Sequence, residues 1–159
     1  MANSPEVGSP APDFTLPAVQ LVDGELVRSE LRLSEQHGKP VVLAFYPGDD
    51  TSVCTKQMCS YSSGLEAFTD LGATVWGISP QDIDSHEGFA RKHGLRMPLL
   101  ADTGREAIAA YGIGLGSMMR RSVFIVDSDG VLRWKHVAML GLTYRDVPTL
   151  VEQLAALKK

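Results

Sequence analysis

Two cysteines are the residues of this sequence best suited to covalent chemistry, and they lie five positions apart, at Cys54 and Cys59. A thiolate is a strong nucleophile and a thiol is a weak one, so the reactivity of a cysteine depends on how far its surroundings favour the charged sulfur. Free cysteines also occur as small, inert, buried residues, and a C-x4-C pair alone fits that role equally well. The residues around the pair decide between the two interpretations.

The residues before Cys54 predict a strand followed by the start of a helix. Residues 41–45 are apolar and typical of a buried strand, and residues 47–50 are turn formers that end it. Thr51 or Ser52 can then cap a helix by accepting a hydrogen bond from one of its first backbone N–H groups. Cys54 would lie in the first turn, where free N–H groups and the positive end of the helix dipole favour a thiolate.

The same helix would hold the two cysteines apart. It would bring one set of side chains near a common face, which leaves Cys59 well off that face: Cys54, Met58, Tyr61, Leu65 and Phe68. Five residues advance a helix by about 7.5 Å, so the two cysteine Cα atoms would lie about 8 to 9 Å apart. A disulfide joins Cα atoms that are usually about 4.4 to 6.8 Å apart. The cysteines can therefore bond only if the residues between them unwind.

The pattern Pro47-x-x-x-Thr51-x-x-Cys54 resembles the active-site motif of peroxiredoxins. The longer form FYPGDDTSVCT, at residues 45–55, with a second cysteine five positions after the first, is similar to the peroxiredoxin Q or bacterioferritin comigratory protein subfamily. Ser52-Val53 stands where Pro-Gly is often found in that subfamily. The resemblance extends over nearly the whole chain.

The resemblance implies a thiol peroxidase that acts on hydrogen peroxide and organic hydroperoxides. The Cys54 thiolate would attack one peroxide oxygen and become a sulfenic acid. Cys59 would then resolve the sulfenic acid as an intramolecular disulfide, which a dithiol protein such as thioredoxin would reduce. The resemblance implies no cofactor, neither metal nor haem nor flavin.

Three further site residues follow from the resemblance. The Thr51 hydroxyl would hold a peroxide oxygen or the thiolate, and Pro47 would limit access of water. Peroxiredoxins of this kind carry a functional arginine immediately before an S/T-x-F strand, and Arg121 occupies that position before Ser122-Val123-Phe124. Because successive strand residues point to opposite faces, we expect Arg120 to point away from the site and to lie at the surface.

Two other functions use the same cysteines. A thiol–disulfide oxidoreductase would share a thioredoxin-like core, although such enzymes characteristically use C-x-x-C. A redox-sensing holdase, whose disulfide changes its binding surface, would need only the two cysteines. Both remain alternatives to the peroxidase.

Strands alternating with helices predict an α/β protein with a largely parallel sheet. Expected elements are a hairpin over 19–27 turning at Asp23-Gly24, a helical turn at 31–36, strands at 41–45, 73–79, 122–127 and 131–137, a short apolar segment at 98–101, and helices beginning near Thr51, Asp82 or Asp84, Asp102 or Thr103, and Asp146. With the resemblance, the fold class is a thioredoxin-like fold: a central mixed sheet flanked by helices, with an N-terminal β-hairpin addition.

Composition agrees with one small domain. The chain has 159 residues, of which 44% are hydrophobic and 21% charged, which predicts a single domain over 1–159 with a loosely held arm at 1–12. The net charge of −4 and the absence of a basic cluster argue against nucleic acid or an anionic membrane as partner. The start of the chain lacks signal-peptide features, so we expect a cytoplasmic protein with reduced cysteines. The resemblance favours a monomer, with a weak dimer as the alternative.

We expect structural roles, and no catalytic ones, for the remaining polar residues and for the glycine-rich segment. The four histidines, His37, His86, His93 and His136, have no zinc-ligand spacing beside the cysteines, and we expect them at the surface or at helix ends. Asp49 and Asp50 are expected to satisfy the backbone of their own turn. Residues 112–119 contain three glycines without the spacing of a nucleotide loop, which indicates a mobile connection.

Overall fold

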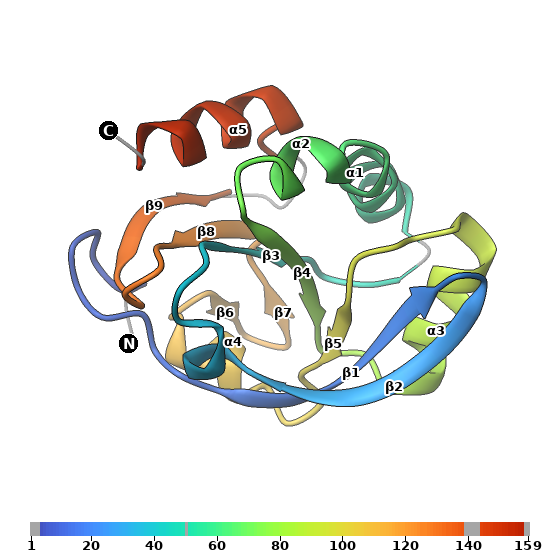
Figure 1. Cartoon of the computed structure of the whole chain (residues 1–159). Helices are drawn as coiled ribbons and strands as arrows, with labels where there is room; N and C mark the ends of the chain where they lie inside the picture. The colour runs from blue at the N-terminus through green and yellow to red at the C-terminus, as the bar shows by residue number, and fades with distance from the viewer. Residues whose placement is uncertain (1–3, 50, 139–143, 158–159) are drawn as a thin grey trace.

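The central sheet consists of seven strands in the order β2-β1-β5-β4-β3-β8-β9 (Figure 1). The computed structural model describes residues 4–49, 51–138 and 144–157. The strands of the sheet are β1 (Thr15–Val22), β2 (Glu25–Arg32), β3 (Val41–Phe45), β4 (Thr74–Ser79), β5 (Leu99–Ala101), β8 (Ser122–Val126) and β9 (Leu132–Val137). β3 and β5 pair with β4 in parallel, and the other neighbours are antiparallel. The predicted α/β class with a mixed central sheet is confirmed.

Helices cover both faces of this sheet. They are α1 (Ser52–Ser63), α2 (Leu65–Thr69), α3 (Ile83–His93), α4 (Glu106–Ala110), α5 (Val147–Ala156) and the 3-10 helix η1 (Leu33–Gln36). In Figure 1, α1, α2 and α5 lie above the sheet, while α4 and η1 lie below it. Within the described ranges, no helix combines the length and the apolar character that crossing a membrane requires.

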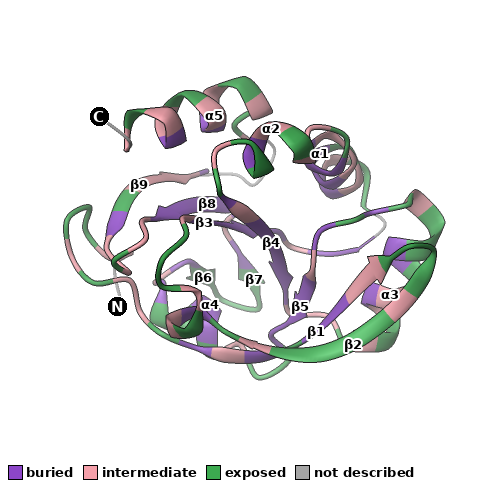
Figure 2. Cartoon of the chain, viewed as in Figure 1, coloured by how far each residue is buried: buried purple, intermediate pink, exposed green. Residues whose placement is uncertain are grey.

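The strand β3 divides the core into two layers. Val42 and Ala44 pack into the cluster that includes Cys54 of α1, while Leu43 and Phe45 pack into the cluster on the opposite face. Because strand side chains alternate between faces, a strand buried on both sides must be apolar throughout, and all five residues of β3 are buried. Figure 2 shows the inner strands buried and the outer strand β2 largely exposed.

The N-terminal hairpin forms as predicted. The strands β1 and β2 pair over their whole length and turn at Asp23 and Gly24, whose φ angles of 50° and 82° are those of the tight turn that suits a two-residue hairpin. Residues 4–12 differ from the loosely held arm that we expected. The Gly8 and Ala11 amides donate to the carbonyls of Leu132 and Gly130, which holds this segment against the turn between β8 and β9.

Several predicted helix ends are confirmed. The Asp82 and Asp146 carboxylates accept hydrogen bonds from Ser85 N and Thr149 N at the starts of α3 and α5. Gly94 ends α3 in the left-handed conformation, with φ 63°. The Asp102 carboxylate accepts a hydrogen bond from Ile108 N and so stabilises the first turn of α4.

The helix α1, which begins after Thr51, is too short to include all the residues of the predicted helix face. It ends at Gly64, where α5 crosses closely: a Cβ on Gly64 would lie 2.9 Å from Cγ1 of Val147. Leu65 and Phe68 therefore belong to the separate helix α2. This break is a correction to the continuous helix predicted from the apolar spacing.

Residues 112–119 also differ from the mobile connection that we expected. They form a small hairpin of β6 (Gly114–Leu115) and β7 (Met118–Met119). The Arg105 side chain donates to the carbonyls of Ser117 and Met118, at 3.2 and 2.7 Å, and ties this hairpin to the start of α4. Sequence spacing did not indicate these long-range bonds.

Candidate active site

The pairing of β3 with β8 brings two distant segments together at one end of the sheet. Phe45, the last residue of β3, lies opposite Ser122, the first residue of β8. After Phe45 the chain leaves the sheet in the loop that leads to Cys54. Arg121 is the residue immediately before the chain enters the sheet again at Ser122. Arg121 therefore lies below the start of α1.

The Arg121 guanidinium contacts the sulfur of Cys54. Its Nη2 lies 2.9 Å from Sγ, its Nη1 donates to Oε1 of Gln57 at 2.5 Å, and both Arg121 and Cys54 are buried, at 3% and 0% exposure. A fixed cation beside a sulfur atom favours the thiolate, and removal from water strengthens the interaction. Arg121 faces the sulfur, as expected, whereas Arg120 is half-buried and not at the surface where we expected it.

Gln57 is a site residue that the sequence interpretation missed. It is fully buried, its oxygen accepts from Arg121, and its amide nitrogen donates to the Tyr61 hydroxyl at 3.2 Å. The Tyr61 hydroxyl donates in turn to the Arg145 carbonyl at 2.6 Å. Burial raises the pKa of Tyr61, so this hydroxyl stays a donor. The available signal was a polar residue three positions after Cys54, on the same helix face.

Thr51 and Pro47 lie in the loop before α1. Thr51 occupies the N-cap position, but its hydroxyl donates to the Gly48 carbonyl at 3.0 Å instead of capping the helix, because the tight loop brings that carbonyl within reach. The cap predicted for Thr51 or Ser52 is therefore wrong. Thr51 is exposed and Pro47 is half-buried. The first helical hydrogen bond of α1 runs from Thr55 N to Thr51 O, so the amide of Cys54 precedes it.

Cys59 lies in the same continuous helix as Cys54, and both are free thiols. Cys59 is half-buried, and burial raises the pKa of its thiol. It packs against the cluster that contains Cys54 without being one of the fully buried residues of that cluster. The structure thus presents the two sulfurs in the separated arrangement that helix geometry predicted.

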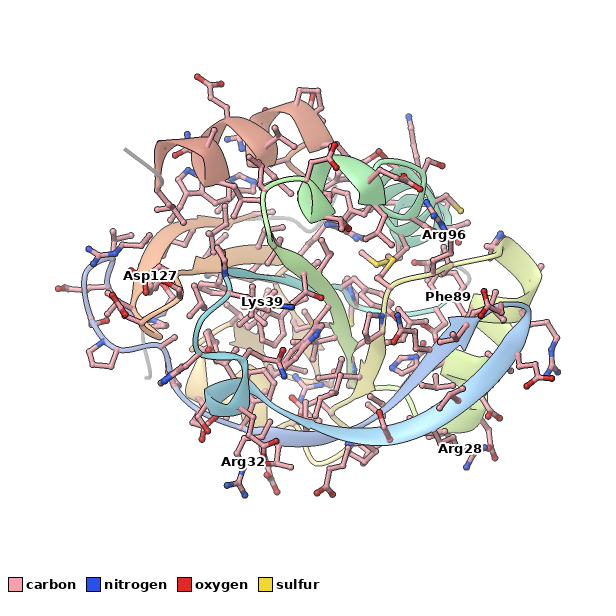
Figure 3. All side chains as sticks on the ribbon, in the orientation of Figure 1. Arg28, Arg32, Lys39, Phe89, Arg96 and Asp127 are labelled. Carbon is pink, nitrogen blue, oxygen red and sulfur yellow. The ribbon has the colours of Figure 1, made fainter. Side chains whose placement is uncertain are left out.

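The C-terminal half of α1 is tied to its neighbours. Arg96 donates from Nη2 to the Ser62 carbonyl at 2.6 Å and from its backbone N–H to the Ser62 hydroxyl at 3.0 Å. It also pairs with Glu66 at 2.7 Å. Figure 3 shows Arg96 beside α1. The helix is therefore anchored after Cys59 by Arg96 and before Cys59 by the contacts of Cys54 and Gln57 with Arg121.

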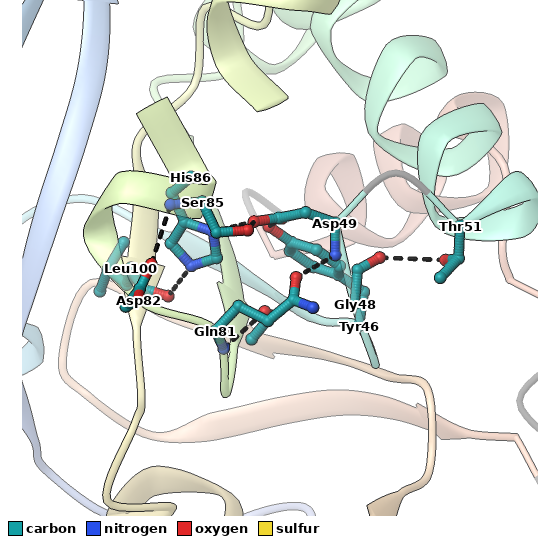
Figure 4. A network of polar contacts seen from close by, with 10 residues as sticks. Tyr46, Gly48, Asp49, Thr51, Gln81, Asp82, Ser85, His86 and Leu100 are labelled. Carbon is teal, nitrogen blue, oxygen red and sulfur yellow. Dashed lines mark hydrogen bonds and ion pairs between the residues drawn. The ribbon is translucent and has the colours of Figure 1, made fainter. Parts of the chain in front are cut away.

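Asp49 and His86 belong to a buried polar network (Figure 4). From the sequence, we expected both residues in other environments. The Asp49 carboxylate accepts from the Tyr46 hydroxyl, the Ser85 hydroxyl and the His86 ring, each at 2.7 Å. His86 is fully buried, which corrects its expected surface or helix-end position. Asp49 was expected to satisfy only its own turn, and it joins the turn to α3 instead. Asp50 lies outside the described residues.

The other three histidines differ in their environments. His37 is exposed, the His93 ring packs against Phe89 with centroids 5.3 Å apart, and His136 is half-buried on β9. Among the residues that the structure describes, no three histidine, cysteine or acidic side chains are gathered as metal ligands.

Comparison with known proteins agrees with this geometry. Residues 7–135 match the model of the AhpC/TSA family. The Triticum aestivum protein named peroxiredoxin Q, chloroplastic, is 39% identical over 130 residues, which are 80% of this chain and 57% of that protein. A Coxiella burnetii protein named putative peroxiredoxin bcp is 34% identical over 146 residues, covering 86% of this chain and 92% of that protein. This chain thus spans little more than half the length of the plant relative.

Solved structures share the whole fold. The reduced 2-Cys peroxiredoxin of Plasmodium vivax has a TM-score of 0.85 at 25% identity and covers 96% of both chains. AhpC of Mycobacterium tuberculosis has a TM-score of 0.86 at 27% identity and covers 98% of this chain and 94% of that one. These matches confirm the predicted thioredoxin-like peroxiredoxin fold. Since the family model covers most of the sequence and the Coxiella relative is matched over nearly its whole length, this chain belongs to the AhpC/TSA family of peroxiredoxins, with peroxiredoxin Q and bcp proteins among its relatives.

Proposed function

We propose that this protein is a thiol peroxidase that reduces hydrogen peroxide and organic hydroperoxides with Cys54 as the nucleophile. The observation that carries the proposal is the 2.9 Å contact between Nη2 of Arg121 and Sγ of Cys54 inside the core. A structural cysteine is normally surrounded by apolar groups that favour its neutral form. A buried arginine, which stays charged, is instead suited to a sulfur that must become an anion.

In the first step, the Cys54 thiolate attacks one peroxide oxygen and breaks the O–O bond. The sulfur becomes a sulfenic acid, and the second oxygen leaves as water or an alcohol after it takes a proton. Negative charge moves from the sulfur towards the leaving oxygen during this step. Arg121 can stabilise that charge at both positions because its guanidinium is planar and has several donors.

The loop before α1 supplies the remaining groups of the pocket. We assign the Thr51 hydroxyl, which now donates to the Gly48 carbonyl, to a peroxide oxygen when substrate is bound. The Cys54 amide precedes the first hydrogen bond of α1 and can donate to developing negative charge. Half-buried Pro47 would limit access of water to the sulfur.

In the second step, Cys59 attacks the Cys54 sulfenic acid, which forms the disulfide and releases water. The helix α1 contains both residues, so residues 55–58 must leave their helical conformation for the sulfurs to meet. The anchors at Tyr61 and Ser62 favour an opening that stops before them, and the bond between Gln57 and Arg121 must break in it. Each backbone hydrogen bond lost costs about 0.5 to 1.5 kcal/mol net, which makes such local opening accessible at ordinary temperature.

A dithiol protein such as thioredoxin would then reduce the disulfide by exchange. This step regenerates both thiols and requires no cofactor in the chain. A monomer in the cytoplasm remains our prediction for the state in which the protein works. The names of the plant relatives place those proteins in chloroplasts.

The test is peroxide consumption coupled to thioredoxin and thioredoxin reductase. The unmodified protein should turn over many times, Cys54→Ser should retain no more than a trace of activity, and Cys59→Ser should lose turnover with thioredoxin while its Cys54 still reacts once with peroxide. Activity that persists in pure Cys54→Ser would refute the assignment of the nucleophile. Reduction of insulin or suppression of aggregation, without peroxide turnover, would instead support the oxidoreductase or the holdase.

A further inference from the structure

Asp49 is a buried carboxylate in the loop that carries Pro47 and Thr51, and it is held by more donors than a turn requires. Its two oxygens accept hydrogen bonds from Tyr46, Ser85 and His86, and its own N–H donates to Oε1 of Gln81. Burying a carboxylate is costly unless it is paired and hydrogen-bonded. These contacts offset that cost, and they join the loop to residues 81–86 at the start of α3.

The partners of His86 define its protonation. Its Nε2 lies 2.9 Å from the carbonyl oxygen of Leu100, which can only accept, and its Nδ1 lies 2.7 Å from Oδ2 of Asp49. Oδ2 also accepts from the Ser85 hydroxyl. A neutral imidazole has a single N–H and can satisfy only one of the two acceptors. A ring with a proton on both nitrogens would satisfy both acceptors and would make Asp49 and His86 a buried ion pair.

This pair connects the loop to two rigid elements. His86 lies on α3, and its second nitrogen bonds to Leu100 in the middle of β5. On the loop side, Gly48 adjoins Asp49, and its carbonyl accepts the hydroxyl of Thr51. A displacement of Asp49 would therefore move the acceptor that orients Thr51, together with the start of α1.

The ion pair also affects the charge near the sulfur. The Tyr46 hydroxyl bonds to Asp49, and burial together with the charges of Asp49 and Cys54 raises the pKa of Tyr46, so this hydroxyl remains a donor close to both groups. A lone carboxylate in this position would oppose the Cys54 thiolate. An imidazolium at His86 would neutralise Asp49 at Oδ2, whereas Tyr46 bonds to Oδ1.

We propose that Asp49 and His86 are positioning residues of this active site: their buried ion pair holds Pro47, Gly48 and Thr51 in the geometry that the reaction of Cys54 with peroxide needs. The proposal rests on the proposed peroxidase function. Neither residue would contact the peroxide. Each acts through Tyr46, Gly48 and Thr51.

The first experiment compares two substitutions of His86 that differ only in which hydrogen bond they preserve. The amide nitrogen of His86→Asn can replace Nδ1 and keep the contact with Asp49, whereas that of His86→Gln can replace Nε2 and keep the contact with Leu100. The readout is the second-order rate constant for oxidation of Cys54 by hydrogen peroxide in a single turnover. The first-order rate constant of disulfide formation is measured in the same traces.

We expect His86→Gln and Asp49→Asn to lower the peroxide rate constant by about ten- to hundredfold, and His86→Asn to lower it much less. Disulfide formation should change by less than about threefold in all three, because the anchors of α1 at Arg96 and Tyr61 are untouched. Asp84→Asn is the matched control, since Asp84 is an exposed carboxylate on α3 that pairs with Arg28. Equal rate constants for His86→Asn and His86→Gln, or for Asp49→Asn and Asp84→Asn, would overturn the proposal.

The second experiment uses the unmodified protein, so its result does not depend on whether a variant folds. In the nitrogen-15 spectrum of the unmodified protein at pH 7, His86 should show protons on both Nδ1 and Nε2, with slow exchange because the ring is fully buried. A single ring proton on His86 would refute the ion pair. If this signature is present and the unmodified protein fails to consume peroxide, the peroxidase function fails and the ion pair stands.

Discussion

Nη2 of Arg121 lies 2.9 Å from Sγ of Cys54, although the two residues are 67 positions apart in the chain. The antiparallel register that places Phe45 opposite Ser122 produces this contact, because it aligns the exit of β3 with the entry of β8. A slip of one residue would bring Arg120 to the sulfur and turn Arg121 to the opposite face. The chemistry proposed for this protein therefore depends on the register of two central strands.

Replacement of Arg121 tests that register. We expect Arg121→Ala to lower the rate constant of Cys54 with peroxide by about ten- to hundredfold, since hydrogen bonds to charged groups contribute about 1.5 to 3 kcal/mol. Alkylation of Cys54 should also need a higher pH, because the thiolate loses its cation. Arg120→Ala removes the same charge from the neighbouring position and should do neither. A larger effect of Arg120→Ala on either measurement would show that the register is wrong.

Gln57 should contribute to the reaction by holding Arg121. Gln57→Met keeps most of the side-chain volume and removes the acceptor for Nη1 of Arg121 and the donor to Tyr61. We expect the peroxide rate constant to fall about tenfold, because Arg121 loses the contact that orients it. Lys56→Met, at the exposed neighbouring position, should be neutral. A rate constant that is the same in both variants would exclude the role assigned to Gln57.

Arg96 should restrain the opening of α1. Arg96→Ala removes the side-chain bonds to the Ser62 carbonyl and to Glu66, while the backbone N–H bond to the Ser62 hydroxyl remains, so the C-terminal end of the helix is held less firmly. We therefore expect faster amide hydrogen exchange over residues 52–63, faster disulfide formation, and less conversion of Cys54 to sulfinic acid at excess peroxide. Arg91→Ala, an exposed residue of α3, is the control. The restraint is absent if exchange over this segment is unchanged in Arg96→Ala.

Exchange over the same segment also tests the unwinding itself. Equal protection of residues 52–63 in the reduced and disulfide forms would contradict it, and Cys59→Ser, which cannot close the bond, provides the reference.

Disulfide formation should depend on pH through Cys59. Burial raises the pKa of this thiol above its ordinary value, so at pH 7 only a small fraction is thiolate. The attacking thiolate fraction then grows as pH approaches the raised pKa, and we expect the first-order rate constant of disulfide formation to increase steadily between about pH 7 and 9. Single-turnover kinetics across this range would measure it. A profile that is flat from pH 7 upward would contradict this expectation.

Alanine substitutions at two glycines should change the free energy of unfolding in opposite directions. In Gly64→Ala the new Cβ would lie 2.9 Å from Cγ1 of Val147, so we expect a loss of about 1 to 3 kcal/mol in the free energy of unfolding. Gly88 lies within α3, and a Cβ there meets no atom within 4 Å, so Gly88→Ala should add about 0.5 to 1 kcal/mol. Denaturant titration of both variants measures the difference. A stabilised Gly64→Ala would mean that α5 does not pack against this residue.

Local sequence was sufficient for the parts of this protein that depend on neighbouring residues. Apolar runs bounded by turn formers predicted β3, β4 and β8, and Asp82, Gly94 and Asp146 end or begin their helices as expected because caps act within one turn. Helix dimensions predicted that Cys54 and Cys59 are apart. The resemblance to peroxiredoxins selected Arg121, and strand alternation added only that Arg120 should point the other way.

The tertiary structure alone decided which polar residues are buried. Asp49 and His86 lie 37 positions apart, and the sequence predicted that Asp49 satisfies its own turn and that His86 lies at the surface or at a helix end. They are buried where the loop after β3, the start of α3 and the middle of β5 meet, because buried polar groups require partners there. The close approach of Val147 to Gly64, where α1 ends, likewise involves residues that are distant in sequence. Periodicity describes one element at a time, whereas pairing of buried charges and close contacts between helices depend on how several elements pack.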